Sequence, residues 1–145
     1  MDESLLKQRR STCPINHIIE IMGDKWTMLV VRDMIFHAKR SYSELQAMPE
    51  GIATNILSER LARLERWGLL TKGRDPQDGR RSIYALTEAG MQLIPLLVEM
   101  MIWSHGHTDA VDMTTGLAAT MAADREGATR ELRARLERAH GTSQT

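Results

Sequence analysis

The fold of this 145-residue chain is decided by the stretch Gly51–Leu70, GIATNILSERLARLERWGLL. At about 100° per residue, Leu57, Leu61 and Leu64 fall on one face of a helix, while polar side chains take the other face. Gly68 follows the last turn, where helices often end in the left-handed conformation that glycine tolerates. The stretch therefore predicts a short amphipathic helix that packs through its leucines and ends before Gly68.

The outward N-terminal half of this helix carries small hydrogen-bonding side chains. Thr54, Asn55 and Ser58 lie there, with Glu59 beside them. Such a surface can read base edges in the major groove of duplex DNA. The same pattern also fits an ordinary surface helix, so the interpretation depends on the flanking segments.

Upstream, the spacing predicts two helices. The first begins at Pro14, which suits a first helical turn, and ends near Gly23. It carries an apolar stripe at helical spacing, formed by Ile15, Ile18, Ile19 and Met22. The second begins after the N-cap candidate Asp24 and runs for about 13 residues, KWTMLVVRDMIFH. Because it contains few charges, we expect it to be the central core helix.

A short helix and a tight turn precede Gly51. In the segment SYSELQAM, residues 41–48, Ser43 and Gln46 match the spacing of a capping box. Pro49 and Gly51 then end the helix. A short helix, a turn of about four residues and an amphipathic helix make a helix-turn-helix unit.

Beyond Gly68 the period changes from helix to strand. Residues 69–74, LLTKGR, and 80–87, RRSIYALT, are extended runs joined by the turn-forming DPQDG. A hairpin at this place is a wing, with basic side chains that can reach phosphates or the minor groove, although Asp75 and Asp78 dilute its potential. The basic side chains are Lys72, Arg74, Arg80 and Arg81.

The C-terminal part is expected to be helical. Thr87 is the N-cap candidate of a long helix, residues 87–107, which Pro95 should bend. This helix is more apolar than one small domain can bury, and a homodimer is the simplest source of a partner surface. Residues 108–145 are expected to form a helical extension, and residues 1–12 a flexible arm.

Composition fits an intracellular globular protein. The chain is 42% hydrophobic and 26% charged, and its formal net charge is zero. Residues 39–81 hold nine basic against six acidic residues, and residues 82–145 hold five against eight. This distribution allows one DNA face and one partner face. With neither a signal-peptide pattern nor an apolar run long enough to span a bilayer, a cytoplasmic location without membrane association is expected.

Four segments resemble the HxlR family of bacterial winged-helix transcriptional regulators. They are CPINHIIEIMGDKWTMLVVRDM (13–34), KRSYSELQ (39–46), GIATNILSERLARLERWGLL (51–70) and YALTEAG (84–90), and the resemblance covers residues 13–107. It implies a mainly α fold with a small β-hairpin wing (α+β), that is, a dimeric winged helix-turn-helix. It also implies a regulator, in the first place a repressor, that binds a near-palindromic operator in double-stranded DNA.

Transferred onto this sequence, the resemblance gives two sets of site residues. The DNA-binding set is Ser43, Thr54, Asn55, Ser58, Glu59, Arg63, Lys72, Arg74, Arg80 and Arg81, with Asn55 best suited to a bidentate contact with adenine. The dimer-interface set is Ile15, Ile18, Ile19, Trp26, Leu93, Leu97, Met100 and Trp103. The chain departs from the family at Ala53, where a capping Ser is common, and in a longer tail after His107.

Cys13 is a candidate redox sensor. It stands at a helix N-terminus, close in sequence to Lys7, Arg9 and Arg10, where a thiolate is favoured. Some family members resemble sensors of oxidants or electrophiles through a cysteine at this place. The alternative is a buried interface cysteine without reactivity. The methionines could also line a pocket at the dimer seam for a small apolar effector.

Two other functions compete with a DNA-binding regulator. A winged-helix module that binds proteins and not DNA would also suit the zero net charge. A metal-dependent protein could use His105, His107 and Asp109, but these lack further ligands at metal-binding spacing, which favours a structural or solvated role. We expect no metal, no cofactor and no enzymatic activity, since no nucleophile with a base and no phosphate-binding glycine loop is found.

Overall fold

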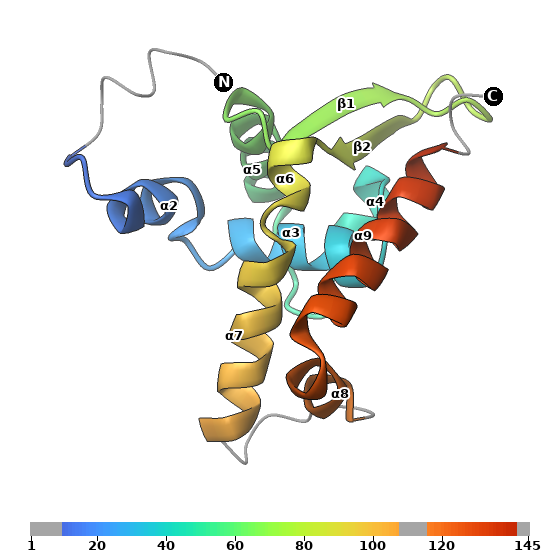
Figure 1. Ribbon diagram of the computed structural model, residues 1–145. Coiled ribbons are helices and arrows are strands. Elements are labelled where there is room, and N and C mark those ends of the chain that lie inside the picture. Colours follow the sequence, from blue (N-terminus) through green and yellow to red (C-terminus); the bar gives the residue numbers. More distant parts are fainter. Residues whose placement is uncertain (1–9, 108–115, 142–145) are drawn as a thin grey trace. The chain divides into compact units, whose positions relative to one another are not determined.

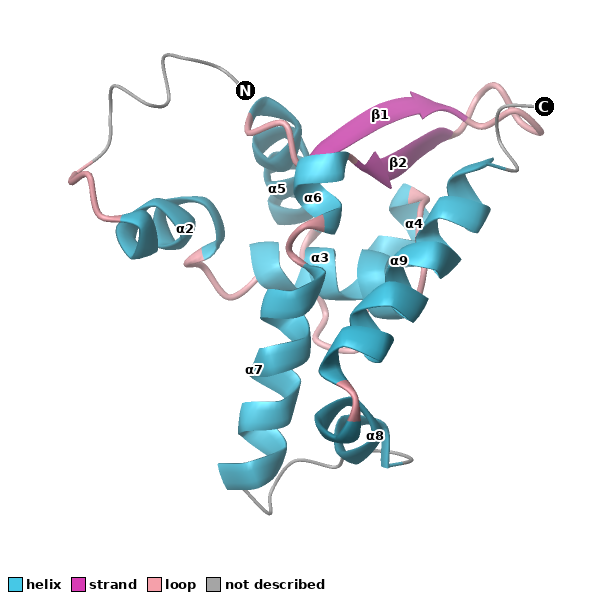
Figure 2. Cartoon of the chain, viewed as in Figure 1, coloured by secondary structure: helices cyan, strands magenta, loops and turns pink. Residues whose placement is uncertain are grey.

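The computed structural model describes residues 10–107 and 116–141 (Figure 1). Lys7 and Arg9 of the predicted arm, and Asp109, lie outside the described residues. The chain divides into two compact units, residues 1–90 and 91–145, and each contains buried apolar side chains of its own. Both units are mainly helical, and one two-stranded antiparallel sheet is found in the described residues (Figure 2).

The first unit has the element order expected for a winged helix. Its elements are α2 (Pro14–Met22), α3 (Thr27–Phe36), α4 (Tyr42–Gln46), α5 (Thr54–Arg66), β1 (Leu70–Arg74), β2 (Ser82–Leu86) and α6 (Glu88–Met91). The predicted core helix α3 buries Val30, Val31 and Ile35 completely. The predicted N-cap is wrong, because α3 begins at Thr27 and its N-cap is Trp26, which has no capping side-chain bond. Asp24 stabilises the turn before the helix instead, since its carboxylate accepts hydrogen bonds from the backbone N–H groups of Trp26 and Thr27 at 2.9 and 3.0 Å.

The helix predicted from Gly51–Leu70 is confirmed as α5. Its leucine stripe is buried, with Leu57 and Leu64 fully inaccessible. Gly68 has a φ of +70°, and the N–H of Leu69 bonds the carbonyl of Leu64 at 3.0 Å, which closes the last turn. At the other end, Ala53 occupies the N-cap position without a capping side chain, so Thr54 is the first helical residue.

The predicted capping box of α4 is wrong. Ser41 is the N-cap, and its hydroxyl accepts from the N–H of Glu44, whose carboxylate accepts from the N–H of Ser41 at 2.8 Å. The box therefore lies two residues before the predicted Ser43–Gln46 pair. Hydrogen bonds from the backbone of Ser41 and Arg40 lower the pKa of Glu44. Gln46 instead donates its side-chain amide to the carbonyl of Ile52 in the turn before α5.

The predicted hairpin is confirmed. Its strands pair antiparallel with Leu70 opposite Leu86 and Lys72 opposite Tyr84. In the connecting loop, the carboxylate of Asp75 accepts from the N–H of Gln77 at 2.9 Å, and that of Asp78 accepts from the N–H of Arg80 at 3.1 Å. Both loop carboxylates thus stabilise the turn.

The prediction of one bent helix from Thr87 is wrong. Thr87 does cap a helix, because its hydroxyl accepts from the N–H of Gly90 at 3.2 Å and donates to the carbonyl of Gly68 at 2.6 Å. That helix, α6, ends at Met91, and α7 begins at Ile94. Pro95 is the second residue of α7, where its missing N–H has no intrahelical partner to lose.

The second unit packs three helices together. They are α7 (Ile94–His107), α8 (Leu117–Ala123) and α9 (Arg125–Gly141), and α7 contacts both of the others. Met121, Leu132 and Leu136 supply buried side chains from α8 and α9, and Arg125 pairs with Glu99 of α7 at 2.5 Å. Among the described residues, every helix is too short or too polar to cross a bilayer.

Candidate nucleic-acid interface

The N-terminal half of α5 presents the predicted polar surface. Thr54, Asn55, Ser58 and Glu59 are all exposed. The side-chain amide of Asn55 makes no hydrogen bond within the described residues, so both its donor and its acceptor are available. An amide with both groups free can make the two bonds that recognise adenine.

Tyr42 anchors this end of α5 to α4, a role that the sequence did not indicate. Its hydroxyl donates to the carbonyl of Thr54 at 2.7 Å and lies 3.1 Å from the hydroxyl of Ser58. The Tyr42 hydroxyl binds the backbone carbonyl of Thr54, so the Thr54 side chain stays exposed at the surface. The Ser58 hydroxyl can therefore contact Tyr42 and still bind a base edge, because a hydroxyl can both donate and accept a hydrogen bond.

The C-terminal half of α5 is held by Asp24. Arg60 donates to its carboxylate at 2.9 Å, and Arg63 lies 3.8 Å away while donating to the carbonyl of Glu20. Burial raises the pKa of Asp24, but hydrogen bonds from Thr27, Arg60 and Trp26 outweigh it and lower the pKa to about 2. Since Arg63 serves this internal network, the DNA surface proposed below does not include it.

Replacing Asp24 with Asn should lower the free energy of unfolding by about 2 kcal/mol at pH 7, because the neutral amide lacks the negative charge that the arginine partners of Asp24 bind. The folded-state pKa lies below the unfolded value, so this stability is complete above about pH 4 and falls as the pH drops toward 2. Urea unfolding of both proteins at pH 7 and pH 3 tests this. The difference in free energy of unfolding between the two proteins should be about half as large at pH 3 as at pH 7. An equal difference at both pH values would contradict the assigned role of the Asp24 charge.

A second ion network fixes the turn between α4 and α5. Arg32 pairs with Glu50 in this turn at 3.0 Å, and the pair lowers the pKa of Glu50 to about 2. Arg32 also pairs with the fully buried Asp33. The second oxygen of the Asp33 carboxylate accepts from the Lys39 ammonium at 2.6 Å. These bonds attach the turn to the core helix and so set the direction in which α5 leaves it.

The hairpin carries the predicted cations at its surface. Lys72, Arg74, Arg80 and Arg81 are exposed. Within the part of the chain that the structure describes, Lys72, Arg74 and Arg80 form no ion pair, so their charges are free for an external anion. Ser43 is exposed on α4, with its hydroxyl 3.2 Å from that of Ser41.

The predicted dimer-interface residues differ in exposure. Ile15 and Ile19 on α2 are 69% and 51% exposed, and Met100 and Trp103 on α7 are 43% and 63% exposed. Ile18, Trp26 and Leu93 are half-buried, whereas Leu97 is buried within its own chain. The exposed members are large apolar side chains in contact with solvent, as expected of a surface that a partner covers.

Cys13 is exposed at the N-cap position of α2. Of the three predicted cationic neighbours, Arg10 alone is described, and its guanidinium bonds Glu20 and Asn16. The redox-sensing role stays a prediction.

The histidines at the end of α7 make local contacts. His107 stacks on Trp103 with ring centroids 4.5 Å apart, and its Nδ1 lies 2.7 Å from the Trp103 carbonyl. His105 is exposed. Within residues 10–107 and 116–141, no three His, Cys, Asp or Glu side chains gather as a metal site would require.

Comparison with known proteins identifies the family. The model of the HxlR-like helix-turn-helix family matches residues 21–112. A protein of Synechocystis and one of Mycobacterium tuberculosis, both named uncharacterised HTH-type transcriptional regulators, are 34% and 35% identical over 61% of this chain. The chain aligns with 64% and 55% of their lengths, less than two thirds of either.

A solved structure agrees with this assignment. PA1607, named as a candidate transcription factor, superposes with a TM-score of 0.64 at 32% identity, covering 74% of each chain. The matched family region includes α3, α4, α5 and the hairpin, the elements that carry the polar surface and the exposed cations. The chain therefore belongs to the HxlR-like helix-turn-helix family and has a winged helix-turn-helix fold.

Proposed function

We propose that this protein is a sequence-specific DNA-binding regulator of transcription. The observation that carries the proposal is the free amide of Asn55, exposed on the first turn of α5. In helix-turn-helix proteins, the N-terminal residues of the second helix contact base edges. The names of the two relatives, both regulators of transcription, support the same function.

In this proposal the contacts fall into two classes. Thr54, Asn55, Ser58 and Glu59 face the bases, while Ser43 and the hairpin cations Lys72, Arg74, Arg80 and Arg81 face phosphates or the minor groove. Phosphate contacts supply affinity without sequence information, and the base contacts select the operator.

We further propose that the regulator binds DNA as a homodimer and that it is a repressor. The exposed apolar residues of α2 and α7 support a dimer, because burying exposed isoleucine and tryptophan side chains against a second copy makes the free energy of association more favourable. Two copies related by a twofold axis would read a near-palindromic operator with half-sites about 34 Å apart. Control by an oxidant through Cys13 is part of the proposal.

Replacing Asn55 with Ala tests the base-reading role. Affinity for a duplex enriched from a random library by the wild-type protein should fall by about 10- to 100-fold, while affinity for random duplexes stays the same. Alanine is the better helix former, so the melting temperature should not fall. Fluorescence anisotropy with both duplexes measures the effect. An equal loss on both duplexes, or no loss on the enriched one, overturns the assignment.

A further inference from the structure

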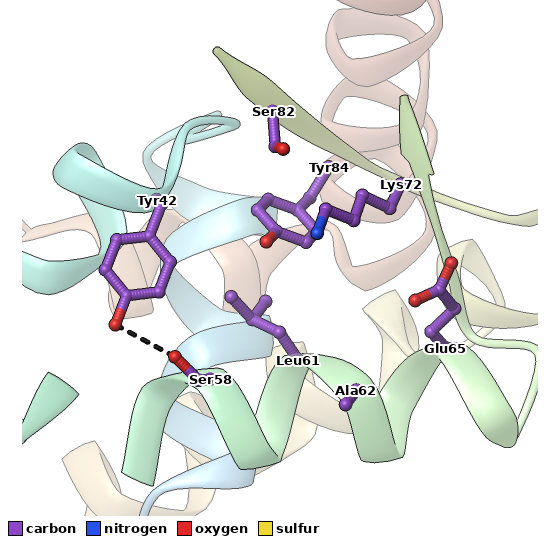
Figure 3. A pocket seen from close by; sticks show the side chains of 8 residues that line it. All are labelled: Tyr42, Ser58, Leu61, Ala62, Glu65, Lys72, Ser82 and Tyr84. Carbon is purple, nitrogen blue, oxygen red and sulfur yellow. Dashed lines mark hydrogen bonds between the residues drawn. The ribbon is translucent and has the colours of Figure 1, made fainter. Parts of the chain in front are cut away.

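A pocket of about 360 Å³ lies between α5 and the hairpin (Figure 3). Its walls come from Tyr42 on α4, Ser58, Leu61 and Glu65 on α5, and Lys72 and Tyr84 on the two strands. Pockets that bind small molecules begin at about 300 Å³ and combine apolar walls with a few polar groups. This pocket is at the small end of that range, which suits a molecule with one ring.

Tyr84 is the most informative residue of the pocket. The residue is only 6% exposed, and its hydroxyl makes no hydrogen bond within the described residues. Figure 3 shows this hydroxyl directed into the pocket. Burial raises the pKa of Tyr84, and the charge of Glu65 adds to the effect, so the hydroxyl keeps its proton and is a donor at neutral pH. Within the described residues, the buried side-chain polar atoms that lack a partner lie elsewhere, so the Tyr84 hydroxyl is open to the pocket and can donate to an acceptor placed there.

Lys72 adds a positive charge to the lining of the same pocket. Lys72 and Tyr84 are directly opposite in the hairpin register, so their side chains share one face of the sheet. The Lys72 ammonium forms no ion pair within the described residues. An ammonium and a phenol hydroxyl side by side can donate to the two oxygens of one carboxylate. Leu61, which is buried, supplies an apolar wall for a ring.

We propose that this pocket binds a small organic acid with a single ring, whose carboxylate is held by the Lys72 ammonium and the Tyr84 hydroxyl and whose ring packs on Leu61. The Glu65 carboxylate disfavours a second negative charge on the ligand and can accept from a hydroxyl or amino substituent. The ligand contacts both α5 and the hairpin.

Occupancy should oppose DNA binding, an inference that rests on the proposed function. The carboxylate neutralises Lys72, one of the cations assigned to a DNA phosphate, so acid and phosphate compete for the same ammonium. By thermodynamic linkage, DNA must weaken binding of the acid by the same factor.

The site is tested by titrating the full chain with benzoate and following backbone amide resonances by NMR. The chemical-shift changes of pocket residues should saturate as benzoate is added, with a dissociation constant of about 1 mM, as a ligand of this size allows. Tyr84→Phe removes only the hydroxyl and should weaken binding about fivefold; Lys72→Gln should weaken it about tenfold. Lys25→Gln, an exposed cation elsewhere, is the matched control and should change nothing.

Benzylamine, with the opposite charge on the same ring, should not bind. No saturable shift with up to about 10 mM benzoate, about ten times the expected dissociation constant, overturns the proposal. So does binding that Tyr84→Phe and Lys72→Gln both leave unchanged while their folds are intact by circular dichroism. Preferred binding of benzylamine overturns the charge assignment.

A separate measurement tests the coupling. Saturating benzoate should weaken the affinity of the wild-type protein for its enriched duplex about fivefold, a typical coupling. Tyr84→Phe should bind the duplex normally and need more benzoate for the same loss. An unchanged DNA affinity with benzoate bound overturns the coupling. If the protein binds benzoate but no duplex, the pocket proposal is supported and the proposed function is refuted. If it binds duplex but no benzoate, only the pocket proposal is refuted.

Discussion

Replacing Arg80 and Arg81 together with Glu should lower affinity for any duplex by about 100-fold at 100 mM salt. Both side chains are exposed in the hairpin loop, where the carboxylates of Asp75 and Asp78 accept bonds from loop backbone. Charge reversal removes two cations and puts two anions near the phosphates. The slope of log affinity against log salt should become shallower by about 2, because two fewer counterions are released.

Anisotropy titrations from 50 to 200 mM salt, a range over which phosphate contacts give a clear slope, measure this effect. Arg130→Glu with Arg138→Glu is the matched control, since it makes the same change in net charge on α9. The control should keep nearly all affinity. Equal losses in both double variants would show that net charge, not the hairpin, sets the affinity. A wild-type protein with no salt-dependent binding at all would favour a winged-helix module that binds proteins.

Replacing Gly90 with Ala should lower the free energy of unfolding by about 3 kcal/mol. A Cβ atom at Gly90 would lie 2.1 Å from the carbonyl oxygen of Leu69 and 3.0 Å from Cδ2 of Leu86. The first contact is with backbone, so α6 must move away from the start of the hairpin to relieve it. Alanine is about 1 kcal/mol better than glycine inside a helix, so a loss of stability here has a steric cause.

Gly79→Ala is the matched control for this variant. A Cβ atom at Gly79 meets nothing within 4 Å, so the same chemical change in the hairpin loop should be neutral or slightly stabilising. Urea unfolding followed by circular dichroism compares the two variants with the wild type. Equal stability of the Gly90 and Gly79 variants would contradict the close packing of α6 on Leu69.

The elements that the sequence predicted well are those with a local signal. The stripe Leu57, Leu61 and Leu64 and the stop at Gly68 define α5 without reference to other segments. The capping box was misplaced because Ser41 and Ser43 both precede a suitable partner by three residues. Ser41 is selected by a distant contact, the bridge to Ile83 of the hairpin, which holds its backbone extended.

Exposure along α5 was also predictable, but the connections of its side chains were not. A helical wheel places Arg63 near the polar face, whereas its partners are Asp24 and Glu20, some forty residues earlier. The contact between Tyr42 and Ser58 and the pocket around Tyr84 likewise join α4, α5 and the hairpin. Contacts of this kind depend on tertiary packing, which no spacing rule encodes.

Selection of duplexes from a random library by the purified full chain tests the central claim most directly. We expect enrichment of a near-palindromic sequence with half-sites about one helical turn apart, bound at least about 1,000-fold more tightly than random duplex. Adenines should lie at the positions that Asn55→Ala no longer discriminates. Failure to enrich any sequence, together with no binding to duplex DNA at about 50 mM salt, would contradict the account.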